Sequence, residues 1–412
     1  MDVVPVTPAQ ARRVRARHVG LALAAVVWFV TAAWLLRTTV PGDLELHSID
    51  VDKTFGAELV REARRYERVL LVLWVSSKLV LLGALWLYAK RGVILLRESA
   101  AGPIGSGMLL GMLGLALTWA IQKPFGLVAL WWERRHGVSE VDYWDWFVGG
   151  WLELTASFVS ICVALLIVMA LARFVGDWWW LPGAAAFTAI AFTFAVVGPW
   201  LTTTSPPDDP GLVRTYEHLA KREGVSGVPL VVETVSGDTS EANAYAFGLA
   251  GTQEIVVWDT LLDGRFSDRE IRIVLAHELG HQAGRHIAKA IVWFALFALP
   301  GAWLLMRFTR RRGGMAKAEA IPLALLVLAC FTLVTAPLQN AVSRRIEADA
   351  DWRALRTTKD PAAARGLFKE FASTSLGDPS PPTWAYLLLE THPTLAQRIA
   401  MADAWESRSS SP

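Results

Sequence analysis

The sequence predicts a mainly α-helical, multi-pass membrane protein with a folded segment outside the bilayer. The chain of 412 residues is 53% hydrophobic and contains 20 tryptophans. Its mean hydropathy of +0.36 is too high for an ordinary soluble protein. Several apolar runs are long enough to cross a bilayer as helices. The second half carries too many charged residues to lie in the membrane throughout, so we expect both kinds of structure.

Seven apolar runs reach spanning length at 1.5 Å per residue. They lie at residues 19–36, 69–88, 104–121, 151–172, 178–200, 287–307 and 320–338. The first run follows an arginine-rich tail and has no small-residue cleavage site, so we expect an anchor helix and not a signal peptide. An odd number of spans places the two termini on opposite sides of the membrane.

Charge and cysteine content exclude several other classes of protein. The net charge is only +2, and the arginines are scattered or end the apolar runs, so we expect no nucleic-acid partner. Cys162 and Cys330 each fall inside a predicted span, where a cysteine is usually a small apolar side chain. Neither a disulfide framework nor a thiolate metal site is indicated.

Residues 201–286, between the fifth and sixth runs, are polar enough to fold outside the bilayer. A turn-rich SPPDDPG precedes a helical segment, LVRTYEHLAKREG. Residues 229–235 read as a strand, and residues 243–250 and 254–258 read as a hairpin that turns at Gly251 and Thr252. We therefore expect a small β-sheet that leads into the next helix.

The helix at 267–286 carries a metal-binding motif. Ser267 followed by Glu270 is the start of a capping box, and apolar residues then recur at helical spacing. His277 and His281 are one turn apart on the same face, so both imidazoles can reach one Zn²⁺ ion. Glu278, beside the first histidine, is placed to act as general base on water. The pattern indicates a zincin-like peptidase, although the motif alone also allows two ordinary histidines on an amphipathic helix.

Two neighbouring features admit more than one interpretation. His286, five positions after His281, lies off the ligand face, so we expect it at the membrane edge and not on the metal. The strand at Asn243, Ala244 and Tyr245 is a candidate for binding an extended peptide at an open sheet edge. An ordinary hairpin strand is equally compatible with the same residues.

A third ligand is expected from the segment SRRIEADADWRAL, which follows the seventh run as a helix. Glu347 and Asp351 are four residues apart on one face, so one can bind zinc while the other holds a ligand histidine or an arginine. In the C-terminal part, His392 either lies in a simple turn or donates a hydrogen bond to a developing oxyanion. In the second case Arg398 would hold a carboxylate.

Several segments together resemble the type I CaaX prenyl endopeptidases, which are integral-membrane zinc enzymes. The segments occur in the family's order: KPFGLVALWWERRHG, NAYAFGLAGTQEIVVWDTLLD, HELGHQAGRH, SRRIEADAD and THPTLAQRI. The resemblance implies about seven helices around a large chamber, with one Zn²⁺ per chain and substrate laid along the strand at Asn243. It also implies roles for individual residues: His277, His281 and Glu347 as ligands, Glu278 as base, Asp351 behind the ligands, and His392 and Arg398 lining the site.

We divide the chain into residues 1–200 with five spans, 201–286 as peptidase segment, 287–340 with two spans, and 341–412 as a helical part with the third ligand. The expected partners are membrane lipid and peptide or protein substrates, including lipid-modified ones.

Three functions remain open: a CaaX-type endopeptidase, a broad-specificity quality-control metalloprotease, and a catalytically silent zinc scaffold. The composition is compatible with a bacterial cell membrane. Loop arginines and the family resemblance place the zinc site on opposite sides of it.

Overall fold

Six long apolar helices form the membrane part of the protein. The computed structural model describes residues 22, 25–92, 94, 101–237 and 241–410. Within these residues, six helices are long and apolar enough to cross a membrane: α3 (Ala57–Arg91), α4 (Gly102–Arg135), α5 (Tyr143–Val175), α6 (Trp180–Val197), α9 (His286–Thr309) and α10 (Ile321–Thr358). The mainly helical, multi-pass fold predicted from the sequence is confirmed.

The predicted first span is described only in part. Residues Ala25–Leu35 form a shorter apolar helix, and its exposed side chains include Phe29 and Trp34. The rest of the predicted run, and the arginine-rich tail before it, lie outside the described residues. A count of seven spans therefore stays a prediction.

The spanning helices present large apolar side chains outward. In the most hydrophobic window of each helix, only 11–22% of the residues are buried within the protein. Phe174 on α5 and Val334 on α10 are 86% and 78% exposed. Such a surface would be costly in water and is stable against hydrocarbon. The protein is therefore a multi-pass membrane protein.

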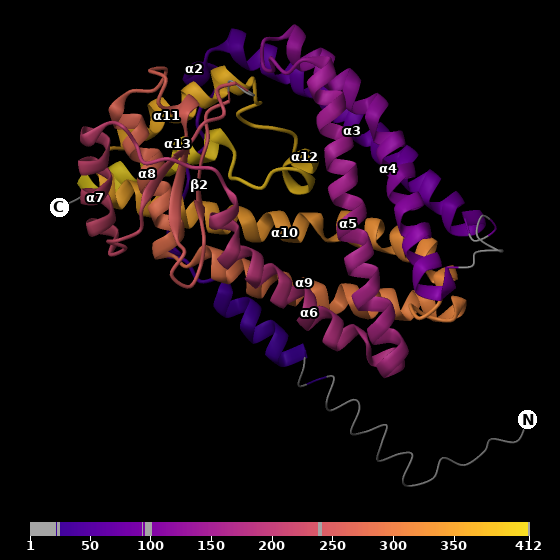
Figure 1. The fold of residues 1–412 in the computed structure, drawn as a ribbon. Coiled ribbons are helices and arrows are strands. Elements are labelled where there is room, and N and C mark those ends of the chain that lie inside the picture. The colour runs from indigo at the N-terminus through magenta and orange to yellow at the C-terminus, as the bar shows by residue number, and fades with distance from the viewer. Residues whose placement is uncertain (1–21, 23–24, 93, 95–100, 238–240, 411–412) are drawn as a thin grey trace, which may run out of the picture.

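The spanning helices lie on two sides of the short helix α12 (Thr383–Leu388) (Figure 1). Helices α3, α4 and α5 pack in sequence on one side, and α6, α9 and α10 on the other. Helix α10 joins the two groups because it also packs against α3 and α4. The sheet and the remaining helices gather at one end of this arrangement.

A three-stranded sheet lies beside the helix that carries His277 and His281. Strands β1 (Leu230–Glu233), β2 (Ala244–Phe247) and β3 (Glu254–Trp258) have the order β1-β3-β2. The predicted hairpin is confirmed as the antiparallel pair β2–β3, and Gly251 in its turn has φ +100°. Strand β1 pairs parallel with β3, so β2 is an edge strand.

The helices outside the membrane part share one hydrophobic core with this sheet. They are α2 (Val51–Phe55), α7 (Pro210–Glu223), α8 (Asp268–Ala283), α11 (Pro361–Ser375) and α13 (Leu395–Ser410). The core includes Val257 of β3, Leu275 of α8, Leu355 of α10, Leu367 of α11 and Ile399 of α13. Residues 201–286 and the C-terminal part therefore fold against each other.

Helix α10 is longer than the sequence suggested. The predicted span at 320–338 and the helix expected after it form one continuous helix of 38 residues. Pro337 lies inside it without ending it. One rigid element thus connects the membrane part to the acidic residues of the site.

Candidate metal centre

Helix α8 begins with the predicted capping box. The Ser267 side chain accepts a hydrogen bond from the backbone N–H of Glu270, and the Glu270 carboxylate accepts one from the backbone N–H of Ser267 at 2.9 Å. These bonds satisfy two donors that helix geometry leaves unpaired. At the other end the helix stops before Gly284, and Arg285 has the left-handed φ of +52°. The start and the end of the motif helix are therefore both defined locally.

Ser267→Ala removes the capping hydroxyl and is expected to lower the free energy of unfolding by about 1 kcal/mol. Chemical or thermal unfolding of the purified protein in detergent measures the change. Ser226→Ala, at an exposed turn residue, is the matched control. An equal effect at both positions would contradict the role of the cap.

Two histidines and one carboxylate converge from two helices. His277 and His281 of α8 and Glu347 of α10 each offer a ligand atom, and these atoms lie within 4.8 Å of one another. The Nε2 atoms of the histidines are 3.0 Å apart, and Glu347 Oε2 lies 3.2 Å from Nε2 of His277 and 3.6 Å from Nε2 of His281. Among the described residues, these three form the one group of His, Cys, Asp and Glu side chains that lie close enough together to hold a metal ion.

A glycine brings the two helices together at this point. A Cβ atom built at Gly280 would lie 3.3 Å from both the carbonyl oxygen of Ala350 and the Cβ atom of Arg353 on α10. Because hydrogen replaces a side chain at Gly280, α10 can approach α8 closely. Glu347 then reaches histidines that are about 70 residues earlier in the chain.

The donor set fits a divalent cation. Glu347 Oε2 is buried, and it has no hydrogen-bond partner of acceptable geometry among the described residues, although three imidazole nitrogens surround it at 3.2–3.6 Å. An unpaired buried oxygen costs free energy, and a bound cation would satisfy it. Nitrogen from two imidazoles and oxygen from one carboxylate is a set typical of catalytic zinc sites.

Glu278 lies next to this cluster and is buried. Burial raises the pKa of its carboxyl above the usual value, because it outweighs the lowering effect of the nearby His277 and His281. The backbone N–H of Ala246 on β2 hydrogen-bonds the same carboxyl. Its position between the histidines and the edge strand is that expected of a general base for a substrate held along β2.

An aspartate and an arginine hold His277 from behind. Asp351 Oδ1 lies 2.9 Å from His277 Nδ1, and Arg398 of α13 binds both Asp351 oxygens, at 2.6 and 2.8 Å. Burial alone would lower the pKa of His277, but hydrogen bonds to Asp351 and Glu347 outweigh it and raise the pKa to about 10. The two carboxylates thus favour positive charge in this pocket. Because Asp351 contacts Nδ1 of His277, the Nε2 atom of the same ring is left to face the cluster.

His392 lies at the open side of the cluster. Its Nε2 atom is 3.2 Å from Glu347 Oε2, and its side chain is 52% exposed. The Thr391 hydroxyl lies 3.0 Å from Nδ1 of the same ring. The structure thus places His392 at the site, on a loop that solvent and a substrate can reach.

The outer edge of β2 faces the motif helix. Trp258 N–H donates to the Asn243 carbonyl across the β2–β3 ladder, so antiparallel alternation directs the backbone groups of Ala244 and Ala246 away from β3. The Ala244 N–H donates to the Asn243 side chain at 2.9 Å. The Tyr245 hydroxyl donates to Glu233 within the sheet. Within the described residues, no further strand pairs with this edge.

Two cavities adjoin the site. One of about 660 Å³ is lined by Asn243, His392 and Arg398, together with residues of α11 and the loop after it. A second cavity of about 590 Å³ shares Glu67 and Asp378 with the first. The two cavities are therefore neighbours that meet at this pair of acidic residues.

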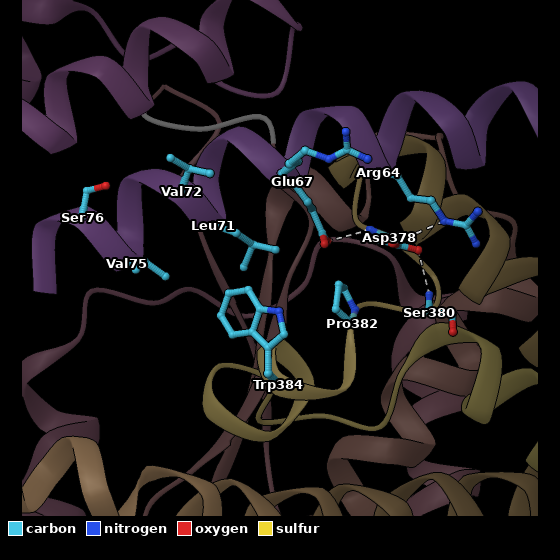
Figure 2. Close-up of a pocket in the computed structure, with 11 residues that line it drawn as sticks. Arg64, Glu67, Leu71, Val72, Val75, Ser76, Asp378, Ser380, Pro382 and Trp384 are labelled. Atoms are coloured by element: carbon cyan, nitrogen blue, oxygen red, sulfur yellow. Dashed lines mark hydrogen bonds and ion pairs between the residues drawn. The ribbon is translucent and has the colours of Figure 1, made fainter. Parts of the chain in front are cut away.

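Figure 2 shows the second cavity between α3 and the segment that leads into α12. Leu71 and Val75 of α3 point toward Trp384 across it, with Arg64 at one end. Its boundary with the first cavity is fixed by the Asp378 backbone N–H, which donates to the Glu67 carboxylate at 2.7 Å. The cavity is thus apolar where Leu71, Val75 and Trp384 line it and charged where it meets the first cavity at Glu67 and Asp378.

Sequence reasoning missed three features near the cluster. His286 begins the candidate membrane span α9 and is not among the metal-binding residues, as expected, but it is buried and its Nδ1 lies 3.1 Å from His281 Nδ1. Asp349, two residues after Glu347, lies 3.0 Å from His286 Nε2. Asp349 lies in the IEADAD segment, but the spacing that predicts a ligand there joins only Glu347 and Asp351. The cavity along α3 had no sequence signal.

Parts of the chain are similar to known proteins. Residues 206–406 match the model of Peptidase family M48. The chain is 26% identical to "Uncharacterized metalloprotease YhfN" of Bacillus subtilis over 60% of this chain and 61% of that protein. It is also 26% identical to "CAAX prenyl protease 1 homolog" of Arabidopsis thaliana over 81% of this chain and 82% of that one. The chain thus spans less than two thirds of the Bacillus subtilis relative.

The fold also has a counterpart among solved structures. The crystal structure of S. mikatae Ste24p superposes with a TM-score of 0.68 and 22% sequence identity. The match covers 93% of this chain and 96% of the other. The two proteins therefore share the same overall fold.

Proposed function

We propose that the protein is a zinc-dependent endopeptidase for membrane-associated peptides or proteins. Residues 206–406 match the model of Peptidase family M48, and the chain is similar to a CAAX prenyl protease 1 homologue. The observation that carries this proposal is the convergence of His277, His281 and Glu347 beside the buried Glu278. We propose one Zn²⁺ per chain, held by the first three residues. Zinc is favoured over harder cations because two of the three donors are imidazoles.

The proposed reaction is hydrolysis of a peptide bond. When bound, zinc lowers the pKa of a water molecule and polarises the substrate carbonyl. Glu278 takes the proton as the water oxygen bonds to the carbonyl carbon, and then delivers it to the departing amine nitrogen as the C–N bond breaks. His392 donates a hydrogen bond to the oxyanion that forms on the carbonyl oxygen. Asp351, held by Arg398, keeps the His277 ring in its binding orientation.

The substrate is proposed to lie along the edge of β2. An extended peptide can pair with the backbone of residues Asn243, Ala244 and Tyr245 as a further strand. Because Glu278 already contacts Ala246 on this edge, a peptide bound there would pass beside the base. The Asn243 side chain, which now accepts from Ala244, would have to give up that bond.

His392→Ala is expected to lower kcat about 10²–10³-fold with bound zinc retained, because only the oxyanion donor is lost. Steady-state cleavage of a fluorogenic peptide, with zinc measured in the same preparation, tests this. His47→Ala, at an exposed histidine, is the matched control. If His392→Ala keeps the wild-type kcat, His392 does not stabilise the oxyanion and only forms part of a turn.

Lipid-modified substrates are the second part of the proposal. The apolar cavity between α3 and Trp384 adjoins the active-site cavity, and it could receive an isoprenoid while the peptide lies on β2. A broad-specificity quality-control protease of the same chemistry is the alternative, since it needs no such group. The apolar lining of this second cavity favours the lipid-modified substrate.

Cleavage of one peptide with and without an isoprenoid near its C-terminus separates the two candidates. We expect a lower KM for the modified peptide, and Trp384→Ala should raise that KM while it leaves the KM of the unmodified peptide unchanged. Trp200→Ala, at an exposed tryptophan outside both cavities, is the control. Equal KM values for the two peptides would favour the broad-specificity protease.

We further propose that the protein resides in a bacterial cell membrane, with lipid against the exposed faces of its spans. The loop arginines favour a catalytic face outside the cytoplasm, and the family resemblance favours the opposite face. A reporter fused after Ser410, which ends the helix that carries Arg398, distinguishes them. Reporter activity only outside the cell would reject the orientation implied by the family.

A further inference from the structure

The second histidine of the motif has its own line of hydrogen bonds, separate from the one that holds the first. His281 Nδ1 lies 3.1 Å from His286 Nδ1, and His286 Nε2 lies 3.0 Å from Asp349 Oδ2. His286 is 3% exposed and Asp349 is fully buried. The line therefore runs through the protein interior, where hydrogen bonds restrict side-chain orientation strongly.

The directions of these bonds follow from what His281 must do. Its Nε2 faces His277 and Glu347, so a metal needs the lone pair of Nε2 and the ring proton must be on Nδ1. That N–H can only donate to His286 Nδ1. His286 then carries its own proton on Nε2 and donates it to Asp349, so every nitrogen along the line has a consistent role.

Asp349 is itself fixed by three further donors. Its Oδ1 atom accepts from the backbone N–H of Thr39 at 2.5 Å and from the Thr39 hydroxyl at 2.6 Å. Its Oδ2 atom accepts from Arg353 Nε at 3.0 Å as well as from His286. With its acceptor capacity filled from two sides, the carboxylate cannot turn away from His286.

The His286 ring packs closely against Gly284. A Cβ atom built at Gly284 would lie 2.3 Å from His286 Nε2 and 2.7 Å from its Cδ2, so the ring rests directly on the glycine backbone. Arg285, in the left-handed conformation, turns the chain between them. The end of α8 and the start of α9 thus bring the His286 ring back to His281.

We propose that His286 is a positioning residue: together with Asp349 it sets the orientation and the proton position of His281 for metal binding, as Asp351 does directly for His277. The proposal depends on the zinc site proposed above. A carboxylate that holds a ligand histidine from behind typically contributes 10–100-fold to metal affinity. Here the carboxylate acts through a second imidazole because Asp349 lies on the opposite side of α10 from Glu347 and Asp351.

Three variants of His286 test this through zinc affinity, measured by competition with a chelator on the purified full chain in detergent. His286→Ala should weaken zinc binding about 10–100-fold. His286→Asn places an amide oxygen near the position of Nδ1 and should stay within a few-fold of wild type. His286→Gln places its amide near Nε2, offers His281 no acceptor, and should resemble His286→Ala.

Controls separate this proposal from the zinc site itself. His218→Ala, at an exposed histidine of α7, should leave affinity unchanged. If wild type binds no zinc, the proposed function fails. If wild type binds zinc and His286→Ala binds it equally, or the Asn and Gln variants have equal affinity, the role of His286 is overturned. If His286→Ala does not fold, the Asn and Gln pair decides, and the visible spectrum of the Co²⁺ form should shift only in the Gln variant.

Discussion

Glu278→Gln is expected to retain about one zinc per chain and to lose peptide cleavage by about 10²–10⁴-fold, the usual contribution of a positioned general base. The amide has the shape of the carboxyl, so the buried position and the contact with Ala246 can be kept. It cannot accept the proton of the attacking water. Initial rates with a quenched peptide, beside zinc content by atomic spectroscopy, measure both quantities.

The control for this variant is the unfolding temperature, which should remain that of wild type. Unchanged cleavage with zinc bound would assign the proton transfer to another group. Lost cleavage together with lost zinc would mean that Glu278 supports the metal, which its place outside the ligand cluster does not predict.

Glu347→Ala is expected to lose both bound zinc and activity. Two imidazoles then remain, and affinity should fall at least about a hundredfold, since even residues that only hold a ligand from behind contribute 10–100-fold. After dialysis the variant should contain far less than one zinc per chain. The same result is expected for His277→Ala and His281→Ala.

Glu319→Ala is the matched control, an exposed glutamate just before the start of α10. Chelation of wild type should abolish activity, and added Zn²⁺ should restore it there but not in Glu347→Ala. Full zinc content in Glu347→Ala would move the third ligand to another carboxylate.

The local elements of the fold were predictable because their signals are local. The Ser267 and Glu270 pair fixed the start of α8, and the turn at Gly251 fixed the hairpin, whose strands differ from the prediction by three residues at most. Pairing across the chain has no such signal. The parallel alignment of β1 with β3, and the union of the last span with the acidic helix, depend on tertiary contacts.

The site was predictable to a different degree at each residue. The spacing of His277 and His281 predicts that both lie on one helix face. Spacing cannot predict that Glu347 lies near them, and the family resemblance alone selects Glu347 over Asp351 as the third ligand. His286 begins the candidate span α9 as predicted, but its contact with His281 could not be predicted, because the offset between the two residues assumes one continuous helix. The helix ends at Ala283, and the left-handed Arg285 redirects the chain.

The unbroken course of α10 links the chemistry to the surrounding lipid. A helix of 38 residues is about 57 Å long, whereas the hydrocarbon layer is roughly 30 Å thick. The part of α10 that carries Glu347 therefore extends beyond the hydrocarbon layer, as a continuation of the part that crosses it. When bilayer thickness changes and such a helix tilts, α8 is carried with it, because α8 packs against α10 at Gly280. The two histidines and Glu347 thus move together, and the ligand geometry is insulated from changes in the bilayer.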